Sequence, residues 1–311
     1  MFERVLITGG GGQLASDLET QLAPHAEVLA PTHAVLDIAD EHALAEVISR
    51  LEPDLVINCA AFHNVEDCEC AIDEAFAVNV RAVLQLARHC VRASAKLVHL
   101  STNYVFDGAA PAPYTEEAPA APLSVYGISK LAGEQAALAY APGALVVRTA
   151  GLYGLQGSAS KGGNFVVRMI ARAQEHGALR VVADQMLTPT FTADLACGIV
   201  SAVAAGVTGL LHLTNAGATS WHGFTEEILE LAGVEVPVEA VQTVLSPGGA
   251  PRPLNGVLQS SVASHWQLAP LRPWNDALAD YLDRAGLLAR GDSRLIAAAP
   301  LTQHGRRPAC S

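Results

Sequence analysis

Basic residues are scarce in this chain of 311 residues: 19 lysines and arginines stand against 31 aspartates and glutamates, giving a formal net charge of −12. No cluster of Lys or Arg is visible, so nucleic acids and anionic membranes are poor candidate partners. No apolar run reaches the roughly 18 residues that a membrane-spanning helix needs, and no signal peptide is visible. We therefore expect a cytoplasmic protein with neither a nucleic-acid nor a membrane partner.

Cysteine is also sparse and has no pattern. The six cysteines show neither a disulfide framework nor the paired C-x-x-C spacing of a zinc site. We expect them to be reduced thiols, and we see no cluster of side chains that predicts a metal. Half of the residues are hydrophobic and only 16% are charged, so most of the chain is expected to fold.

Short apolar segments alternate with helical patterns over the first half of the chain. We expect strands at 5–8, 27–30, 55–58, 96–100 and 144–148, and helices at 14–22, 44–51, 71–93 and 124–140. Such alternation is typical of parallel βαβ units, so we predict an α/β fold with a Rossmann-type doubly wound sheet. Functional groups should then lie at the carboxyl ends of the strands.

The pattern loosens after residue 150. Later strands are expected near 180–183 and 209–214, and helices near 223–232 and 274–289. We assign residues 1–150 to an NAD(P)-binding domain and 151–290 mainly to a smaller α/β substrate domain, with returns to the main sheet. The Gly- and Ser-rich stretch 154–163 is predicted to be a mobile loop, and residues 291–311 a disordered tail.

Four consecutive glycines, Gly9 to Gly12, follow the first predicted strand. Glycines let the backbone approach a pyrophosphate, which sits on the N-terminus of the next helix. A simple tight turn would look the same in isolation, but the strand–loop–helix context favours a dinucleotide site. Residues 30–33, where an acidic side chain would select NAD and a basic one NADP, contain neither. The choice between NADPH and NADH therefore stays open.

Tyr126 and Lys130 are four residues apart, which puts both side chains on one face of a helix. A lysine ammonium there favours the tyrosinate and lowers the tyrosine pKa, so that the phenol can act as an acid or base. Thr102 follows a predicted strand and offers a hydroxyl that can polarise a carbonyl. Each feature alone has an ordinary explanation, as a surface pair or a cap. Their order, with the glycine loop, predicts hydride and proton transfer to a carbonyl.

Further stretches extend this pattern: Ile57–Ala61, Val65–Glu69, Ser101–Gly108, Asp184–Thr190 and Arg252–Pro253. With the glycine loop and the Tyr-x-x-x-Lys pair, they resemble the extended short-chain dehydrogenase/reductases and, within them, the dTDP-4-dehydrorhamnose reductase family. The resemblance covers roughly residues 3–285.

The resemblance implies that NADPH or NADH reduces the C4 ketone of a dTDP-4-keto-6-deoxy-L-sugar, with conversion of dTDP-4-dehydro-L-rhamnose to dTDP-L-rhamnose as the expected reaction. Tyr126 would deliver the proton, and Thr102 would hydrogen-bond the reacting oxygen. Lys130 would lower the pKa of Tyr126 and hold the nicotinamide ribose. These roles amount to carbonyl polarisation plus general-acid catalysis.

The resemblance also implies binding residues. Those expected at the cofactor, with the pair at 37–38 near the adenine, are Gly9, Gly12, Gln13, Leu14, Asp37, Ile38, Asn58, Ala60, Ala61, Asn79, Tyr126 and Lys130. Those expected at the substrate are Thr102, Asn103, Tyr104, Asn164 and Arg252. Arg252 and Asn164 are candidates for the diphosphate because N–H donors suit phosphate oxygens. A surface arginine and a helix-capping asparagine are the alternatives.

Three residues depart from the family pattern, and one of them is Gln259, which replaces an Asp. Asn103 stands where the family usually has Asp, which removes a negative charge beside the sugar. Gly151 stands where a tryptophan is common, and we expect its loss to open the sugar pocket to a different or larger keto-sugar. The identity of the sugar therefore stays open.

Two other functions remain as alternatives. A nucleotide-sugar epimerase or dehydratase on the same fold would use the same loop; an epimerase would keep NAD bound, and Asn103 and Tyr104 replace the acidic pair that a dehydratase needs. A non-catalytic, NADP-binding regulatory subunit would not need the intact set of Thr102, Tyr126 and Lys130. A homodimer is also left open.

Overall fold

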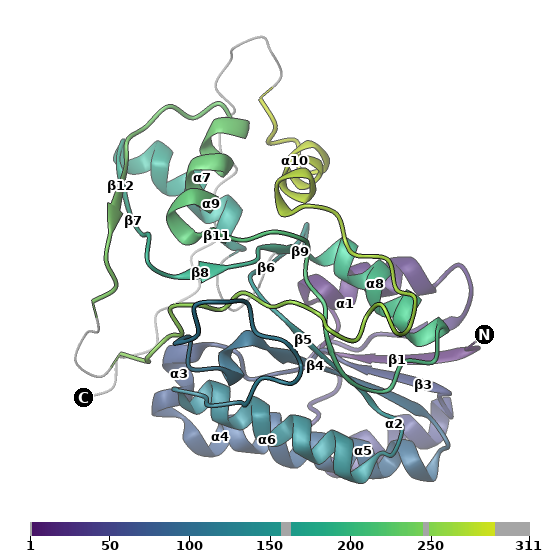
Figure 1. The fold of residues 1–311 in the computed structure, drawn as a ribbon. Helices are drawn as coiled ribbons and strands as arrows, with labels where there is room; N and C mark the ends of the chain where they lie inside the picture. The colour runs from purple at the N-terminus through teal and green to yellow at the C-terminus, as the bar shows by residue number, and fades with distance from the viewer. Residues whose placement is uncertain (1, 157–162, 245–248, 290–311) are drawn as a thin grey trace.

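A six-stranded parallel sheet forms the centre of the computed structural model, which describes residues 2–156, 163–244 and 249–289 (Figure 1). The strand order is β10-β5-β4-β3-β1-β2. The bounds are β1 Arg4–Thr8, β2 Glu27–Leu29, β3 Leu55–Asn58, β4 Lys96–Thr102, β5 Leu145–Thr149 and β10 Gly209–His212. All pairings within it are parallel. The predicted Rossmann-type sheet is therefore confirmed.

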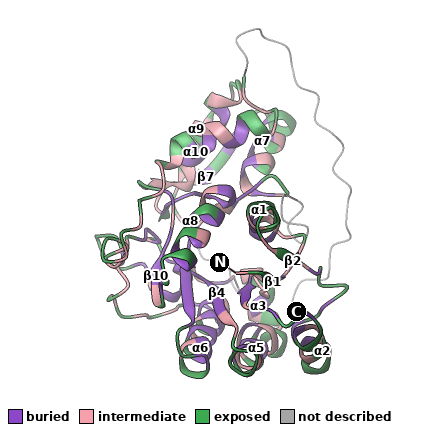
Figure 2. Ribbon diagram, turned by 90° about the vertical axis from the view of Figure 1, so that its right-hand side faces the viewer, coloured by how far each residue is buried: buried purple, intermediate pink, exposed green. Residues whose placement is uncertain are grey.

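Helices cover both faces of this sheet (Figures 1 and 2). On one face lie α1 (Gln13–Leu22) and α8 (Thr192–Ala204), and on the other α2 (Glu41–Leu51), α5 (Ala82–Arg92) and α6 (Val125–Tyr140). Side chains alternate along β1: Val5 and Ile7 join the core under α1 and α8, whereas Leu6 joins the opposite core. Two hydrophobic cores thus hold the carboxyl ends of the strands in place.

The predicted helix over 71–93 is interrupted. It consists of α4 (Ile72–Phe76), one π-helical turn η1 (Ala77–Arg81) and α5, preceded by the short helix α3 (Val65–Cys70). A π turn adds a residue to the helical repeat, and such turns are frequent at functional sites. Here it carries Asn79, a buried polar residue whose contacts are described below.

The later part of the chain builds a third hydrophobic cluster around Tyr153, Phe191, Phe224 and Tyr281. Its elements are α7 (Phe165–His176), α9 (Trp221–Leu231), α10 (Trp274–Arg284) and the parallel pair β7 (Leu179–Val182) and β12 (Val238–Val241). The smaller pairs are β6 (Leu152–Tyr153) with β9 (Thr190–Phe191), and β8 (Met186–Leu187) with β11 (Thr219–Ser220). The sequence patterns had not indicated α7, α8 or β12. Most of the loop predicted at 154–163, and the tail predicted from 291, lie outside the described residues.

The thiols differ from expectation at one position. Cys59, Cys90 and Cys197 are free thiols, but Cys70 is disulfide-bonded, so the expectation that every cysteine is reduced is wrong there. Within the described ranges, no helix has the length and apolar character needed to cross a membrane.

Candidate active site

The glycine loop packs against the end of the neighbouring strand. Gly9 has φ +78°, and a Cβ at this position would lie 2.8 Å from the backbone nitrogen of Ala60. Helix α1 then begins after Gly12 without a side-chain cap on its first amides, and the Oε1 atom of Gln13 is buried without a hydrogen-bond partner. Uncapped amides at a helix N-terminus suit a phosphate group. Gly9, Gly12, Gln13 and Leu14 therefore fit the diphosphate of a dinucleotide.

The side chains of two buried asparagines hydrogen-bond the backbone beside this loop. The Asn58 Oδ1 atom accepts hydrogen bonds from the Thr8 hydroxyl at 2.7 Å and from the Ala60 backbone nitrogen at 3.2 Å. Asn79 clamps the backbone of Phe62, accepting from its nitrogen and donating to its oxygen, both at 2.9 Å. These contacts order the segment that carries Ala60 and Ala61. The asparagines therefore order the backbone beside the glycine loop, and their place at the cofactor stays a prediction.

The segment after β2 lies beside the glycine loop, since Gly10 donates a 2.9 Å hydrogen bond to the carbonyl of Pro31. Farther along, Asp37 is exposed and accepts from the nitrogen of Ala39 at 2.9 Å, whereas Ile38 is buried. Asp37 is thus accessible to a polar group of a bound nucleotide. The contact of Asp37 and Ile38 with the adenine stays a prediction.

Thr102 and Tyr126 meet at the carboxyl end of β4. Thr102 is the last residue of the strand, and its hydroxyl shares a hydrogen bond with the Tyr126 side chain. Tyr126 stands in the first turn of α6, where the Ser124 hydroxyl caps the helix by accepting from Gly127. The cap fixes the start of the helix and with it the direction of the phenol. The sequence prediction that these two hydroxyls act together is thus consistent with their placement.

Burial raises the pKa of Tyr126, with only a partial lowering from its hydrogen bond to Thr102. The pKa of Tyr126 is therefore raised and not lowered as expected, because desolvation of the phenolate outweighs the surrounding polar groups. The phenol is consequently held neutral, which is the form that can donate a proton.

Lys130 is almost entirely buried, and its ammonium donates a 2.6 Å hydrogen bond to the backbone oxygen of Leu100. Burial lowers its pKa to about 8, although Glu134 and Cys59 oppose the shift. The side chain therefore ties α6 to β4 and carries a positive charge near neutral pH. An ammonium has two further protons available for a ligand.

Two of the predicted substrate residues, Asn103 and Tyr104, directly follow Thr102, and Arg252 lies close to Tyr104. The rings of Tyr104 and Tyr126 meet edge to face, with centroids 5.5 Å apart. Asn103 is buried and donates to the carbonyl of Gly256 at 3.2 Å. Arg252 forms a 2.6 Å ion pair with Glu66, and its Nε atom is buried without a partner. The segments that carry Asn103 and Gly256, from the two halves of the chain, thus meet next to the pair Tyr104 and Tyr126.

A small cavity of about 30 Å³ lies beside this cluster, lined by Asn103, Tyr104, Gly151, Gln185, Met186, Leu187, Trp221 and Pro253. Gly151 has φ +57°, and a Cβ there would lie 2.8 Å from Leu187 Cδ1 and 3.1 Å from Pro189 Cα. The neighbouring chain therefore fills the space next to Gly151. The expectation that its missing side chain enlarges the sugar pocket is not supported, because Leu187 and Pro189 close the gap.

Asn164 occupies a different role from Arg252. Its Oδ1 atom caps α7 by accepting from Val167 at 3.0 Å, and its Nδ2 atom donates to the Gly154 carbonyl and the Tyr281 hydroxyl, both at 2.8 Å. With all these atoms engaged and the side chain 4% exposed, Asn164 acts as a helix cap. We therefore do not place it at the diphosphate.

Two carboxylates at the site were missed from the sequence. Glu69 accepts a 2.8 Å hydrogen bond from the nitrogen of Val125, directly before Tyr126. Glu134 is buried on α6 and paired with Arg148. The sequence does contain a signal for Glu134, because this glutamate lies one turn after Lys130 on a helix rich in small and apolar residues.

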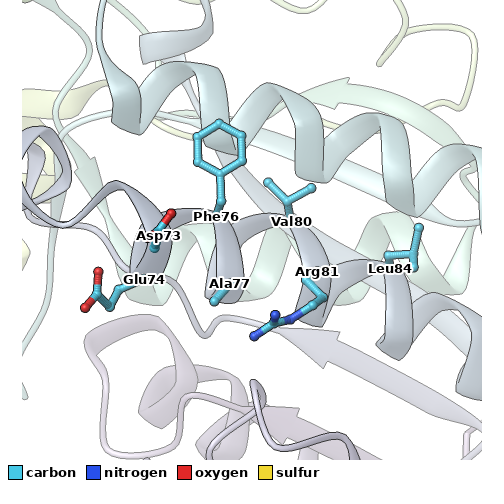
Figure 3. A pocket seen from close by; sticks show the side chains of 7 residues that line it. All are labelled: Asp73, Glu74, Phe76, Ala77, Val80, Arg81 and Leu84. Carbon is cyan, nitrogen blue, oxygen red and sulfur yellow. The ribbon is translucent and has the colours of Figure 1, made fainter.

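A second, open hollow lies over α4, η1 and the start of α5 (Figure 3). Its lining residues are Asp73, Glu74, Phe76, Ala77, Val80, Arg81 and Leu84. None of the predicted site residues is among them. Within the described ranges, no group of three or more His, Cys, Asp or Glu side chains is arranged to hold a metal ion.

Comparison with known proteins agrees with this geometry. Residues 3–287 match the family described as RmlD substrate binding domain. The chain belongs to this family. The dTDP-4-dehydrorhamnose reductase of Mycobacterium tuberculosis (strain ATCC 25618 / H37Rv) is 42% identical over 287 residues, covering 90% of this chain and 92% of that protein. The resemblance inferred from the sequence is therefore confirmed.

Two further proteins similar to this chain have names that give a substrate or a bound cofactor. The dTDP-4-keto-6-deoxy-D-glucose reductase of Streptomyces niveus is 38% identical over 281 residues, covering 89% of this chain and 96% of that protein. The crystal structure of dTDP-4-dehydrorhamnose reductase from Bacillus anthracis str. Ames, in complex with NADP, has a TM-score of 0.86 and 33% identity. The match covers 91% of this chain and 100% of the Bacillus anthracis chain.

Proposed function

We propose that this chain reduces the C4 ketone of a dTDP-4-keto-6-deoxy-sugar with NADPH or NADH. The observation that carries the proposal is the hydrogen-bonded pair Thr102 and Tyr126 at the end of β4, next to the loop that fits a dinucleotide. Membership of the RmlD family and the names of the relatives support the sugar nucleotide as substrate. We take dTDP-4-dehydro-L-rhamnose, reduced to dTDP-L-rhamnose, as the first substrate to test.

We assign the cofactor and each of three residues a separate role in the reduction. When bound, the reduced nicotinamide supplies the hydride. Thr102 donates to the carbonyl oxygen of the sugar and stabilises the negative charge that develops there. Tyr126, held neutral by burial, gives its proton to that oxygen. We assign to Lys130, one helical turn after Tyr126, the positive charge that would stabilise the tyrosinate left after the proton has been transferred.

Arg252 is our candidate for the diphosphate of the substrate. Its guanidinium now pairs with Glu66 at 2.6 Å, and the carboxylate of Glu66 also accepts from the nitrogen of Ala250 at 2.8 Å. Burial raises the pKa of Tyr104, and the charge of Arg252 lies close enough to offset part of this rise. The ring of Tyr104 in turn meets that of Tyr126 edge to face. A diphosphate on Arg252 would therefore place the sugar beside the two tyrosines, in competition with Glu66.

The test is turnover of enzymatically prepared dTDP-4-dehydro-L-rhamnose, followed as loss of NADPH or NADH absorbance in parallel reactions. Formation of one dTDP-6-deoxy-hexose per reduced cofactor consumed would support the proposal. No turnover with any dTDP-4-keto-sugar would overturn it. Tightly bound NAD with no net consumption would instead indicate an epimerase, and stoichiometric capture of a protein partner without activity would indicate a regulatory subunit.

Location and assembly form a further part of the proposal. A cytoplasmic location is part of this proposal, and the net charge of −12 with no basic cluster supports an enzyme without nucleic-acid or membrane partners. We keep the division into a cofactor domain at 1–150 and a mainly substrate-binding domain at 151–290 as proposed boundaries. A homodimer is left open, and mass measurement in solution would decide it.

A further inference from the structure

Three buried side chains lie directly behind the site and have no role in the proposed reaction so far. They are Glu134 on α6, Arg148 on β5 and Ser101 on β4. Glu134 Oε1 accepts a 2.8 Å hydrogen bond from Arg148 Nε, and Oε2 accepts one of 2.7 Å from Arg148 Nη2. The Ser101 hydroxyl donates to the same Oε1 atom. This arrangement is a two-pronged ion pair with an added hydroxyl.

The network joins the elements that carry the reacting groups. Ser101 and Arg148 are paired in register on neighbouring strands, and Ser101 immediately precedes Thr102. Lys130, one turn before Glu134 on α6, donates to Leu100. Helix α6 therefore holds two consecutive residues at the end of β4, one through the Lys130 ammonium and one through the Glu134 carboxylate. The position of Thr102 relative to Tyr126 depends on both attachments.

The network also controls charge around Lys130. The titratable groups that face this ammonium are Cys59 after β3, His99 on β4 and Glu134 on its own helix. The pKa of His99 is lowered well below its usual value by burial, so His99 is neutral, and burial raises the pKa of Cys59 to about 12, so that thiol is protonated. Glu134 is thus the one negative charge among the groups named here.

A buried ion pair is expensive to retain for stability alone. Its desolvation costs as much as its attraction returns, and apolar replacements of similar volume are often neutral or stabilising. Both side chains are almost fully buried, at 4% and 1% exposure, and Arg148 Nη1 has no hydrogen-bond partner. Stability alone is therefore a weak reason for this pair.

We propose that Glu134 is a positioning residue for the reduction: through Ser101 it sets the place of the Thr102 hydroxyl, and through its charge, moderated by Arg148, it keeps Lys130 protonated. This inference rests on the proposed function. Glu134 does not touch the substrate in this account; it acts through its two neighbours.

The test compares the pH dependence of kcat/KM in Glu134→Gln and Arg148→Gln with that of the wild type. Loss of the carboxylate should move the basic limb to lower pH by about one unit, because Lys130 loses its nearby anion. Loss of the guanidinium should move the same limb to higher pH, since a nearby cation has gone. A merely structural role would lower activity in both variants without moving the limb in opposite directions.

The Ser101→Ala variant keeps the ion pair of Glu134 and Arg148 but removes the hydrogen bond that links Glu134 to β4. We expect kcat to fall about tenfold to a hundredfold, as for a displaced catalytic group, with NADPH affinity and the position of the basic limb unchanged. Glu239→Gln is the matched charge control, because Glu239 pairs with Arg180 on the exposed surface of β7 and β12. It should leave rate and limb as in the wild type.

The outcomes separate the two proposals. An inactive wild type overturns the proposed function itself. An active wild type whose Ser101→Ala variant keeps full kcat, or whose Glu134→Gln variant folds and shows an unmoved basic limb, overturns the role of Glu134 alone. If the charge variants unfold, as judged by thermal melting and NADPH binding, the kcat of Ser101→Ala still decides the positioning role.

Discussion

The Lys130 ammonium donates a 2.6 Å hydrogen bond to the backbone oxygen of Leu100, two residues before Thr102. A side chain on α6 therefore holds the strand end that carries the polarising hydroxyl. The same burial that permits this contact lowers the pKa of Lys130 to about 8. One lysine thus links the geometry of the site to its response to pH.

That pKa predicts an alkaline limit to activity. Below pH 8 Lys130 is charged and can stabilise the tyrosinate formed by proton donation; above pH 8 it loses its proton and the charge disappears. We expect kcat/KM to fall with a basic limb near pH 8, and Lys130→Met to lose most activity at every pH. A profile that is flat from pH 7 to pH 9.5 would contradict this role of Lys130.

The same shift predicts a change in stability with pH. An unfolded lysine keeps its proton up to its usual value near 10.5, whereas the folded one releases it near 8. Between these values the unfolded state binds more protons, so the contribution of Lys130 to the free energy of unfolding rises with pH. Urea melts at pH 7.5 and pH 10 should show this rise in the wild type, relative to Lys130→Met. Equal changes in both proteins would contradict it.

Asn103→Asp should weaken the contact between the residues that follow β4 and the segment around Gly256. Asn103 donates to the Gly256 carbonyl at 3.2 Å, and a carboxylate there would face that oxygen without a proton. We expect about 1–3 kcal/mol lower stability and a raised KM for the keto-sugar. Asn64→Asp is the control, since Asn64 caps α3 through its oxygen atom, which aspartate retains. Equal stability of the two variants would argue against this contact.

Gly151→Ala should destabilise the fold more than Gly143→Ala. Both glycines have positive φ, but a Cβ at Gly143 meets nothing within 4 Å, whereas one at Gly151 meets Leu187 at 2.8 Å. The backbone penalty of about 1–2 kcal/mol is common to both, and crowding should add about 1–3 kcal/mol at Gly151. Thermal melts measure the difference. Equal melting temperatures would show that the space beside Gly151 is open after all.

Arg252→Ala should weaken binding of dTDP, whereas Glu66→Gln should strengthen it. The ion pair of 2.6 Å between these residues must open before Arg252 can bind a diphosphate, so removing the Glu66 charge removes the competitor. Calorimetric titration with dTDP measures both effects, with NADPH affinity as the control. Stronger dTDP binding by Arg252→Ala would exclude this arginine from the diphosphate site.

The sheet and the catalytic trio were predictable because they depend on local patterns. Apolar strands between helical segments specify the parallel sheet, and a Tyr-x-x-x-Lys spacing places two side chains on one helical face. The π turn at Ala77–Arg81 was not predictable, since the bonds that hold Asn79 run to Phe62 and Ser129, far along the chain.

The pKa of Tyr126 and the surroundings of Gly151 escaped prediction for a related reason. Both depend on tertiary burial: the phenol is desolvated by segments that meet only in the fold, and Leu187 closes the gap beside Gly151. Asn164 illustrates the opposite case. Its position directly before the helix Phe165–His176 is typical of an N-cap, and the structure assigns it that role.

The central claim is that Tyr126 gives the proton when a dTDP-4-keto-sugar is reduced. The most direct measurement compares Tyr126→Phe with the wild type in single-turnover reduction of dTDP-4-dehydro-L-rhamnose, with NADPH affinity measured for both. The account predicts a rate lowered by about 10²–10⁴-fold with NADPH affinity unchanged. A variant that binds NADPH and reduces the sugar at the wild-type rate would contradict it.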